Sequence, residues 1–309
     1  MSPEEPVVLT CAISGVIASR DQCPAIPYTP AEYAAEARRI VDEGGVQIHI
    51  HARKPDGSPS YEAEDFVAIR DAIRAEVGAA AIINFSTGTV GVPVDKRVAY
   101  LEAGRPEVAA LNMGSMNYAK YSRKRKEFVF KFVFANPFEE IVALLQAMRR
   151  LHIKPEHECF DLGHVGALEP LLDMGLLGPP LHANFVMGVV GGAPASARNV
   201  AAMADNLPRS SGDRADPAGS GEVQHHWSVI GIGREQWSLV AAALTLGGSV
   251  RVGLEDNFYL PDGRMARSNG ELVAKARQMT EDAGRRLANV AEARARLGID
   301  RRVAEPSQP

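Results

Sequence analysis

Residues 46–60 read VQIHIHARKPDGSPS, an alternating run that ends in a charged loop rich in proline and glycine. In a β-strand, side chains two positions apart share a face, so the valine and the two isoleucines would pack on one side. His49 and His51 would then lie together on the opposite side. Two imidazoles on one rigid element suit a metal ion, although two hydrogen-bonded core histidines would give the same pattern.

Seven further runs of this kind surround the stretch, and helical patterns separate them. The predicted strands span residues 7–14, 46–52, 80–87, 108–115, 157–161, 181–188, 226–233 and 249–256. A helical tail follows the last strand. Alternation of strand and helix indicates a parallel sheet, and the number of units predicts an α/β fold, a (β/α)8 TIM barrel that forms a single domain over residues 1–309. A doubly wound open sheet competes, but the first strand–helix turn lacks its G-x-G-x-x-G.

Composition narrows the class of protein. The net charge of −4 gives no electrostatic reason to expect nucleic acid or a membrane surface as a partner. The chain has no apolar run long enough to cross a bilayer and does not open with a signal peptide. Its three cysteines are scattered, which indicates a reducing compartment without a disulfide framework. We therefore expect a soluble cytoplasmic enzyme.

Two segments interrupt the alternation. Residues 208–222 form a polar insertion rich in proline, glycine and serine, which predicts a loop without evident chemistry. Residues 117–137 hold a basic cluster, Arg123 to Lys126, before an apolar run. A solvated surface is the simpler interpretation of the cluster, and an anchor for the phosphates of a nucleotide-like cosubstrate is the alternative.

Polar side chains collect at the ends of the predicted strands, where a TIM barrel carries its chemistry. They are Ser14, His49, His51, Ser86, Thr87, Ser115, Glu158, Asp161, Glu255 and Asp256. Arg251, Gly253 and Glu255 share one face of the last strand, which we take to be the inward face. Glu255 could therefore reach across the first strand to the two histidines and complete a three-ligand site like that of catalytic zinc. A salt bridge to an arginine is the structural alternative for this glutamate.

Asp256 follows at the end of the same predicted strand, where Arg251 could meet it. A guanidinium group lowers the pKa of a neighbouring carboxyl group, so we expect Asp256 to be held ionised. Such a carboxylate can still act as a base if a metal ion acidifies the proton to be removed. An ordinary buried ion pair is the alternative.

Five motifs follow one another along the chain. They are H-I-H-A-R-x-P-D-G-x-P-S, N-F-S-T-G, L-N-M-G-S-M-N, E-C-F-D-x-G-H and V-R-V-G-L-E-D-N. Together they resemble the β-keto acid cleavage enzymes, from about residue 7 to residue 298. The resemblance implies a (β/α)8 barrel, one zinc ion (Zn²⁺) per subunit and a homo-oligomer, a tetramer. It also implies a retro-Claisen type reaction, in which a 3-oxo acid and acetyl-CoA become acetoacetate and a new acyl-CoA.

The resemblance assigns the reacting groups motif by motif. It places the zinc ligands at His49, His51 and Glu255. It places the pair that generates the carbanion at Asp256 and Arg251. These positions agree with the site that strand alternation indicates.

The resemblance also assigns the pocket. Glu158 matches a pocket glutamate, and Ser86 and Ser115 match positions that contact the substrate. Thr89 replaces the second glycine of the usual S-T-G-G turn, which would narrow the pocket floor. Ile17 stands where members that cleave an amino-substituted keto acid have a glutamate. Because isoleucine cannot pair with an ammonium group, an uncharged aliphatic 3-oxo acid is the expected substrate. Arg20, three residues on, leaves an anionic tail, as in a 3-oxo dicarboxylate, as the alternative.

A metal-dependent barrel hydrolase of the amidohydrolase type is the alternative enzyme, because it too uses H-x-H. That class carries H-x-H on its first strand and adds histidines at the ends of strands five and six. Here H-x-H lies on the second strand, and His157 and His182 lie near the starts of their predicted strands. A non-enzymatic metal-stabilised binding protein is a further possibility, but it would not need the Arg251–Asp256 pair in an open mouth.

Overall fold

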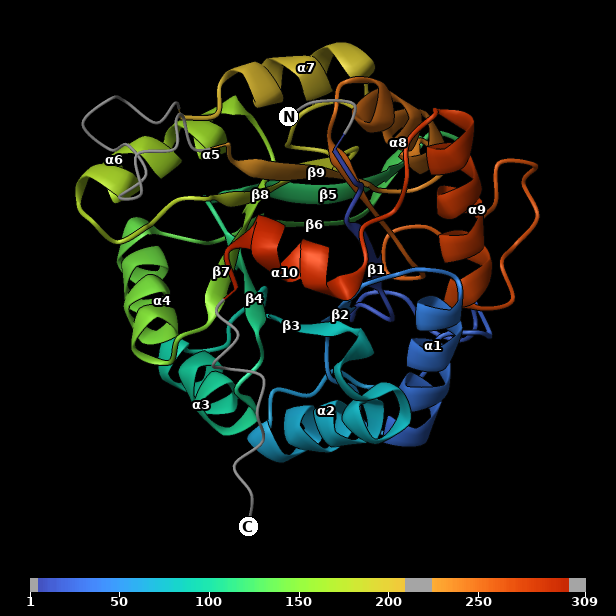
Figure 1. Cartoon of the computed structure of the whole chain (residues 1–309), viewed down its shortest axis with the longest axis horizontal. Coiled ribbons are helices and arrows are strands. Elements are labelled where there is room, and N and C mark those ends of the chain that lie inside the picture. The colour runs from blue at the N-terminus through green and yellow to red at the C-terminus, as the bar shows by residue number, and fades with distance from the viewer. Residues whose placement is uncertain (1–4, 209–223, 300–309) are drawn as a thin grey trace.

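The computed structural model describes residues 5–208 and 224–299, which build a closed parallel barrel (Figure 1). Its strands are β1 (Leu9–Ala12), β2 (Gln47–Ile50), β3 (Ile82–Ser86), β4 (Val108–Asn112), β7 (Lys154–Cys159), β8 (His182–Met187), β9 (His226–Gly231) and β10 (Ser249–Val252). They follow one another around the ring in chain order, and β1 pairs with β10 to close it. The predicted (β/α)8 barrel is confirmed.

Helices surround the strands (Figure 1). They are α1 (Pro30–Asp42), α2 (Ala63–Val77), α3 (Val94–Gly104), α4 (Phe138–Arg150), α5 (Leu162–Gly166), α6 (Leu168–Asp173), α7 (Ala197–Asp205), α8 (Gln236–Thr245), α9 (Asn269–Asp282) and α10 (Val290–Leu297), with a 3₁₀ turn at Gly78–Ala80. A capping box starts α1: the Thr29 side chain accepts a hydrogen bond from the Glu32 amide, and Glu32 accepts one from the Thr29 amide. None of the described helices has the length and apolarity that a membrane crossing requires.

The main core lies between the strands and the surrounding helices. Ile48 and Ile50 of β2 are fully buried in it, with Phe66 and Ile73 of α2. Each such side chain contributes about 1.5–3 kcal/mol of burial free energy, so the outward face of β2 is fixed firmly. A one-residue shift in register would turn this apolar face inward and the histidines outward, which makes the orientation of the histidines a consequence of packing.

A second apolar cluster closes the amino-terminal end of the barrel, which we call the base. Val8, Ile82 and Val108 line the inside of the ring there, and Ala293 and Leu297 of α10 pack against them. Figure 1 shows α10 lying across the barrel axis. The helical tail predicted after the last strand, residues 269–287, contains α9, whereas the helix that plugs the base, α10, lies beyond it and was not predicted.

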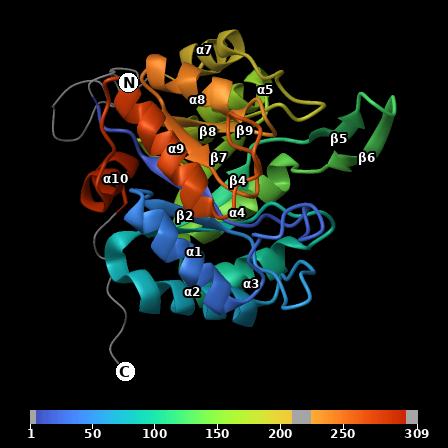
Figure 2. The ribbon, with the colours of Figure 1, turned by 90° about the vertical axis from the view of Figure 1, so that its right-hand side faces the viewer.

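A hairpin that the sequence patterns did not predict rises from the opposite end, the mouth. It consists of β5 (Met116–Ser122) and β6 (Glu127–Phe134), paired antiparallel between β4 and α4. Figure 2 shows it projecting away from the barrel body. The basic cluster from Arg123 to Lys126 forms its tip. The predicted insertion at 208–222 lies, apart from Pro208, outside the described residues.

Candidate functional site

His49 and His51 face the inside of the mouth, as alternation along β2 predicts. His49 is 1% exposed, and the two rings stand 5.3 Å apart. The Tyr33 hydroxyl donates a hydrogen bond to the His51 carbonyl over 2.7 Å, which fixes the backbone where the strand ends. Burial, followed by Arg251, lowers the pKa of His49 well below its usual value, so its imidazole is neutral and keeps a nitrogen lone pair available.

A turn at Gly253 brings in the carboxylates from the other end of the chain. Strand β10 ends at Val252, so the strand predicted to run to residue 256 is too long. Gly253 has a φ of +141°, and a Cβ there would lie 2.1 Å from the carbonyl oxygen of Ala12. The turn that follows orients two successive residues, Glu255 and Asp256, toward Arg251. In a continued strand these two side chains would point to opposite faces.

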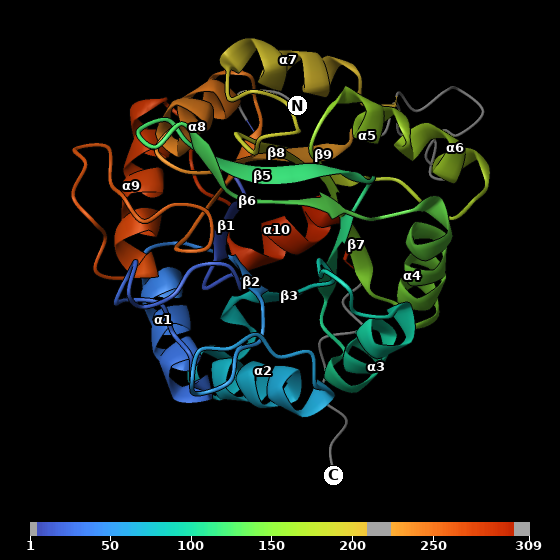
Figure 3. The same cartoon turned by 180° about the vertical axis from the view of Figure 1, so that it is seen from behind.

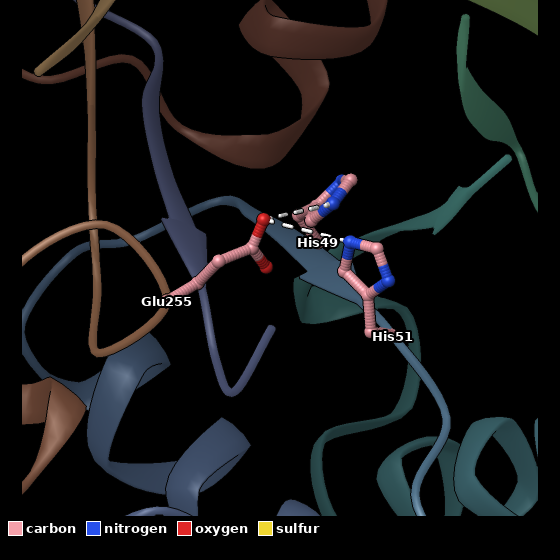
Figure 4. A group of neighbouring side chains, drawn as sticks. All are labelled: His49, His51 and Glu255. Atoms are coloured by element: carbon pink, nitrogen blue, oxygen red, sulfur yellow. Dashed lines mark ion pairs between the residues drawn. The ribbon is translucent and has the colours of Figure 1, made fainter. Parts of the chain in front are cut away.

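The two histidines and Glu255 converge on one point (Figure 4). Oε1 of Glu255 lies 3.7 Å from Nε2 of His49 and 3.5 Å from Nε2 of His51. Donor atoms around a tetrahedral zinc ion stand about 3.4 Å apart, because each bond to the metal is about 2.0–2.1 Å. Nε2 of His49 and Oε2 of Glu255 are buried without a hydrogen-bond partner. The donor types, their spacing and these unsatisfied atoms all fit a divalent metal ion.

Arg251 lies at the centre of the carboxylates and is 2% exposed. Its guanidinium group donates to both oxygens of Asp256 over 3.0 Å, to Glu158 over 3.0 Å and to Glu255 over 2.7 Å. Such charge-assisted contacts in a buried place fix the orientation of each carboxylate. Although burial raises the pKa of Glu255, His51 and Arg251 hold it well below its usual range.

The expectation that Arg251 keeps the pKa of Asp256 low is wrong. Burial raises the pKa of Asp256 to about 6, because desolvation outweighs the effect of the guanidinium group. Burial likewise raises the pKa of Glu158 to about 8, with Arg251 acting in the opposite direction. A carboxyl group that titrates near neutrality suits proton transfer better than one held permanently ionised.

The residues predicted to line the substrate pocket lie less close together than the two histidines and the carboxylates. Ser86 is buried at the end of β3, beside β2, and its Oγ accepts a hydrogen bond from the Gly88 amide over 3.2 Å. Ser115 is exposed, and its Oγ accepts a hydrogen bond from the Asn136 amide over 2.8 Å. Thr89 is half-buried, and Ile17 is 60% exposed. In the described part of the chain, no hydrogen bond or ion pair joins Ser115, Thr89 or Ile17 to the metal-site residues or to Arg251.

Arg53 is a residue of the site that the sequence patterns did not identify. Its guanidinium group donates to the carbonyl oxygens of Gly15 over 2.8 Å, Ala18 over 2.5 Å and Gly57 over 2.7 Å. It thereby fastens the loop after β1 to the loop after β2, beside both histidines. Its place in H-I-H-A-R, two residues after His51, was the available signal.

Glu156 was missed because β7 begins at Lys154, three residues before the strand predicted at 157–161. Glu156 is fully buried inside the barrel, where its Oε2 accepts a hydrogen bond from Gln47 over 2.7 Å and lies 3.3 Å from Nε2 of His182. Burial raises its pKa. With His49 and Glu158 it forms a second group whose donor atoms stand close enough to hold a cation, although Arg251 lies nearby.

Comparison with known proteins gives consistent results. The family model described as beta-keto acid cleavage enzyme matches residues 6–299. The chain is 34% identical to a 3-keto-5-aminohexanoate cleavage enzyme of Acetoanaerobium sticklandii, over 96% of this chain and 100% of the relative. It is 33% identical to a 3,5-dioxohexanoate:acetyl-CoA acetone transferase of Paraburkholderia graminis (97% of each chain). It is 31% identical to a 3-oxoadipate:acetyl-CoA acetyltransferase of Cupriavidus necator (96% and 95%).

Among solved structures, the barrel is similar to that of ObcA in its apo form. The TM-score is 0.72 at 21% sequence identity, and the match covers 89% of this chain and 66% of ObcA. At this level of identity the likeness shows the fold alone.

Proposed function

The chain belongs to the β-keto acid cleavage enzyme family, and from this premise we propose that it is a zinc-dependent acyltransferase. It would convert a 3-oxo acid and acetyl-CoA into acetoacetate and a new acyl-CoA. Relatives named for acetyl-CoA-dependent transfer support the choice of cosubstrate. The observation that carries the proposal is the convergence of a three-donor metal group and the Arg251–Asp256 pair at the mouth of one barrel.

His49, His51 and Glu255 would hold the metal ion, and two imidazoles with one carboxylate favour zinc. When bound, the ion supplies a Lewis acid that polarises the ketone of the 3-oxo acid. Glu255 is held in place by Arg251, which is the kind of supporting contact that sets ligand orientation.

Asp256 would take a proton from C2 of the 3-oxo acid, with Arg251 fixing the orientation of its carboxylate. The C2 carbanion attacks the thioester carbonyl, and CoA leaves as a thiolate. The thiolate then attacks the original ketone carbon, and the bond between C2 and C3 breaks. The products are acyl-CoA and acetoacetate, whose carbanion regains a proton. Glu158 lies against the same guanidinium group, and Ser86 could donate a hydrogen bond to a developing oxyanion.

The substrate would be an uncharged aliphatic 3-oxo acid. Ile17 offers no charge to an ammonium group, and Thr89 would narrow the pocket floor. Ser115 would contact the substrate from the root of the hairpin. These three assignments belong to the proposal and rest on the family resemblance.

The decisive experiment incubates purified enzyme with acetyl-CoA and a panel of 3-oxo acids, and identifies acyl-CoA products by mass spectrometry. We expect one new acyl-CoA per accepted acid, with acetoacetate in equal amount. Acid substrates labelled with ¹³C at C2 should place the label in acetoacetate and leave the acyl-CoA unlabelled. Label in the acyl-CoA, or hydrolysis without acyl-CoA, would contradict the proposal.

We further propose that the protein is a cytoplasmic homotetramer built from single-domain subunits. Cys11, Cys23 and Cys159 are buried free thiols, which accords with a reducing compartment. Light scattering on size-exclusion fractions measures the number of subunits.

A further inference from the structure

We propose that the β5–β6 hairpin is the binding arm for acetyl-CoA, with its basic tip holding the phosphates and its aromatic face lying along the pantetheine chain. This inference rests on the proposed acetyl-CoA-dependent function and adds a site to it. Its observations are the charge of the hairpin, the order of side chains along one of its faces and the place where it is rooted.

The hairpin differs sharply in charge from the rest of the molecule. Residues 116–134 contain six lysines or arginines and one glutamate, a net charge of +5. The whole chain has a net charge of −4, so the remaining residues together carry −9. An acidic protein that concentrates positive charge on one projecting arm creates a local attraction for an anion.

The positive charge is concentrated at the tip. The four residues Arg123, Lys124, Arg125 and Lys126 are all exposed. In the part of the chain that the structure describes, Arg125 is the one tip cation in a salt bridge, with Glu127 over 3.1 Å. Most of the tip charge is therefore free to meet phosphate groups, which arginine and lysine bind well.

One face of the hairpin changes from apolar to aromatic to basic between root and tip. Met116 pairs with Phe134 at the root, and both are buried. Tyr118 pairs with Phe132 farther along, and their rings stack 5.3 Å apart and are half-buried. Lys120 comes next, in register with Phe130, whose ring stacks 6.0 Å from that of Phe132. The residues Phe130, Phe132 and Tyr118 thus form a row of stacked rings, and the basic tip lies beyond it.

The root of the hairpin lies against the candidate site. Figure 3 looks into the mouth and shows β5 and β6 crossing it on the side of β8 and β9. Phe134 belongs to one apolar cluster with Val186 of β8 and Ile230 of β9, and Ile230 is the register partner of Arg251. The Ala119 amide also donates to the Val190 carbonyl over 3.2 Å. Burial raises the pKa of Tyr118, and the charges of Glu255, Asp256 and Glu158 act in the same direction.

The order of features therefore follows the layout of acetyl-CoA. The reacting groups lie at the root, where the thioester must be, and the half-buried rings offer apolar contact to the pantetheine chain. The seven residues of β5 extend roughly 20 Å, a length of the same order as an extended pantetheine arm. The tip then meets the phosphates of the nucleotide end.

The test compares two variants with equal charge change. The hairpin variant is Lys124→Glu with Lys126→Glu. The control is Arg149→Glu with Lys275→Glu, on the outer helices α4 and α9. For each protein, kcat/KM is measured with acetyl-CoA and with acetyl-pantetheine, which carries the same thioester without the nucleotide and its phosphates.

We expect the wild type and the control to prefer acetyl-CoA, and the hairpin variant to lose that preference by about tenfold or more, because two attractive charges become repulsive. The loss should lie in KM for acetyl-CoA rather than in kcat. Adenosine 3′,5′-bisphosphate should compete with acetyl-CoA in the wild type and weakly in the hairpin variant. Competition by inorganic phosphate alone at the same concentrations would point to general anion binding and overturn the assignment to CoA.

An unchanged preference in the hairpin variant would also overturn the inference. Calorimetric titration with free CoA measures the affinity of the hairpin for CoA without catalysis. Equal dissociation constants for the wild type and the hairpin variant would contradict the inference. If the wild type binds CoA through the hairpin yet forms no acyl-CoA, the proposed reaction fails while the binding arm stands.

Discussion

The two ends of the barrel both bury histidines, and they use them in different ways. At the mouth, His49 and His51 direct Nε2 atoms at Glu255, and Nε2 of His49 has no hydrogen-bond partner. At the base, Nδ1 of His157 meets the His182 carbonyl over 2.9 Å, and Nδ1 of His226 accepts a hydrogen bond from Arg296 over 3.2 Å.

The base histidines also have buried ring nitrogens without a hydrogen-bond partner, Nε2 of His157 and Nδ1 of His182, so an unpaired nitrogen alone does not distinguish the two ends. At the mouth, by contrast, two imidazoles converge on one carboxylate. In the described residues, the groups able to hold a metal ion both include His49, and neither includes His157, His182 or His226. Burial of an imidazole is thus a weak signal for a metal site. The informative signal is a pair of imidazoles that converge on one oriented carboxylate. The base also gives no support to an amidohydrolase site, since such a site would need its further histidines at the mouth.

The largest effect should come from exchanging a histidine at each end. His49→Ala removes a proposed ligand, so we expect loss of bound zinc and a fall in kcat of about ten-thousandfold, because a Lewis acid supplies several kcal/mol. His226→Gln should keep the zinc content of the wild type. Elemental analysis and the acyl-CoA assay measure both. Full zinc in His49→Ala, or zinc loss in His226→Gln, would break the distinction between the two ends.

The next effect separates two roles within the mouth, that of the residues proposed to hold the metal ion and that of the proton acceptor, Asp256. Asp256→Asn keeps the shape but removes the proton acceptor, so exchange of the C2 protons with D₂O should slow by about a thousandfold. Zinc content should stay normal, since Glu255 remains paired with Arg251. Proton exchange is read by NMR without acetyl-CoA. Exchange near the wild-type rate would assign the proton transfer to another group, with Glu158 the first to test.

A smaller effect concerns His157 at the base of the barrel and the stability of the protein at acid pH. Burial lowers the pKa of His157 to about 3, against about 6.5 in an unfolded chain. Between these pH values the unfolded chain binds more protons, so the free energy of unfolding falls as pH drops below about 6.5. One such group contributes about 1.4 kcal/mol per pH unit.

Urea unfolding of His157→Gln at several pH values between 6 and 4 tests this. The variant should show a slope of unfolding free energy against pH that is shallower by about that amount. Parallel curves for the variant and the wild type would mean that His157 does not sense the burial assigned to it.

The smallest effect tests the rim of the mouth. Ile17→Glu should shift the ratio of kcat/KM values toward a 5-amino-3-oxo acid and away from an uncharged analogue, by about two- to fivefold. The effect is modest because the side chain at position 17 is 60% exposed, and exposed ion pairs contribute about 0.2–1 kcal/mol. The wild type should favour the uncharged acid. If the ranking is the same in both proteins, residue 17 does not contact the substrate tail.

The fold and the position of the candidate site could be predicted from two features of the sequence, the alternation of side chains along the strands and the number of strands. The period of two in residues 46–52 orients His49 and His51 correctly, because burial of the intervening isoleucines leaves no other choice. The ring order then brings the last strand beside the first, which places Glu255 within reach.

What the sequence could not supply depends on turns and on desolvation. Alternation cannot orient Glu255 and Asp256 together, since the turn at Gly253 interrupts the strand. The raised pKa of Asp256 depends on how much protein surrounds it, which no local pattern measures. The hairpin did have a local signal, because Phe128, Phe130, Phe132 and Phe134 recur with a period of two directly after the basic cluster.

The pairing of β1 with β10 has a consequence for assembly. The proposed metal donors come from distant parts of the chain, so they meet only when the last strand closes the ring. Bringing such distant segments together costs loop-closure entropy that local contacts do not repay. An ion that binds only the closed ring stabilises it by mass action. Metal supply would then govern how completely newly made chains fold, in addition to what they catalyse.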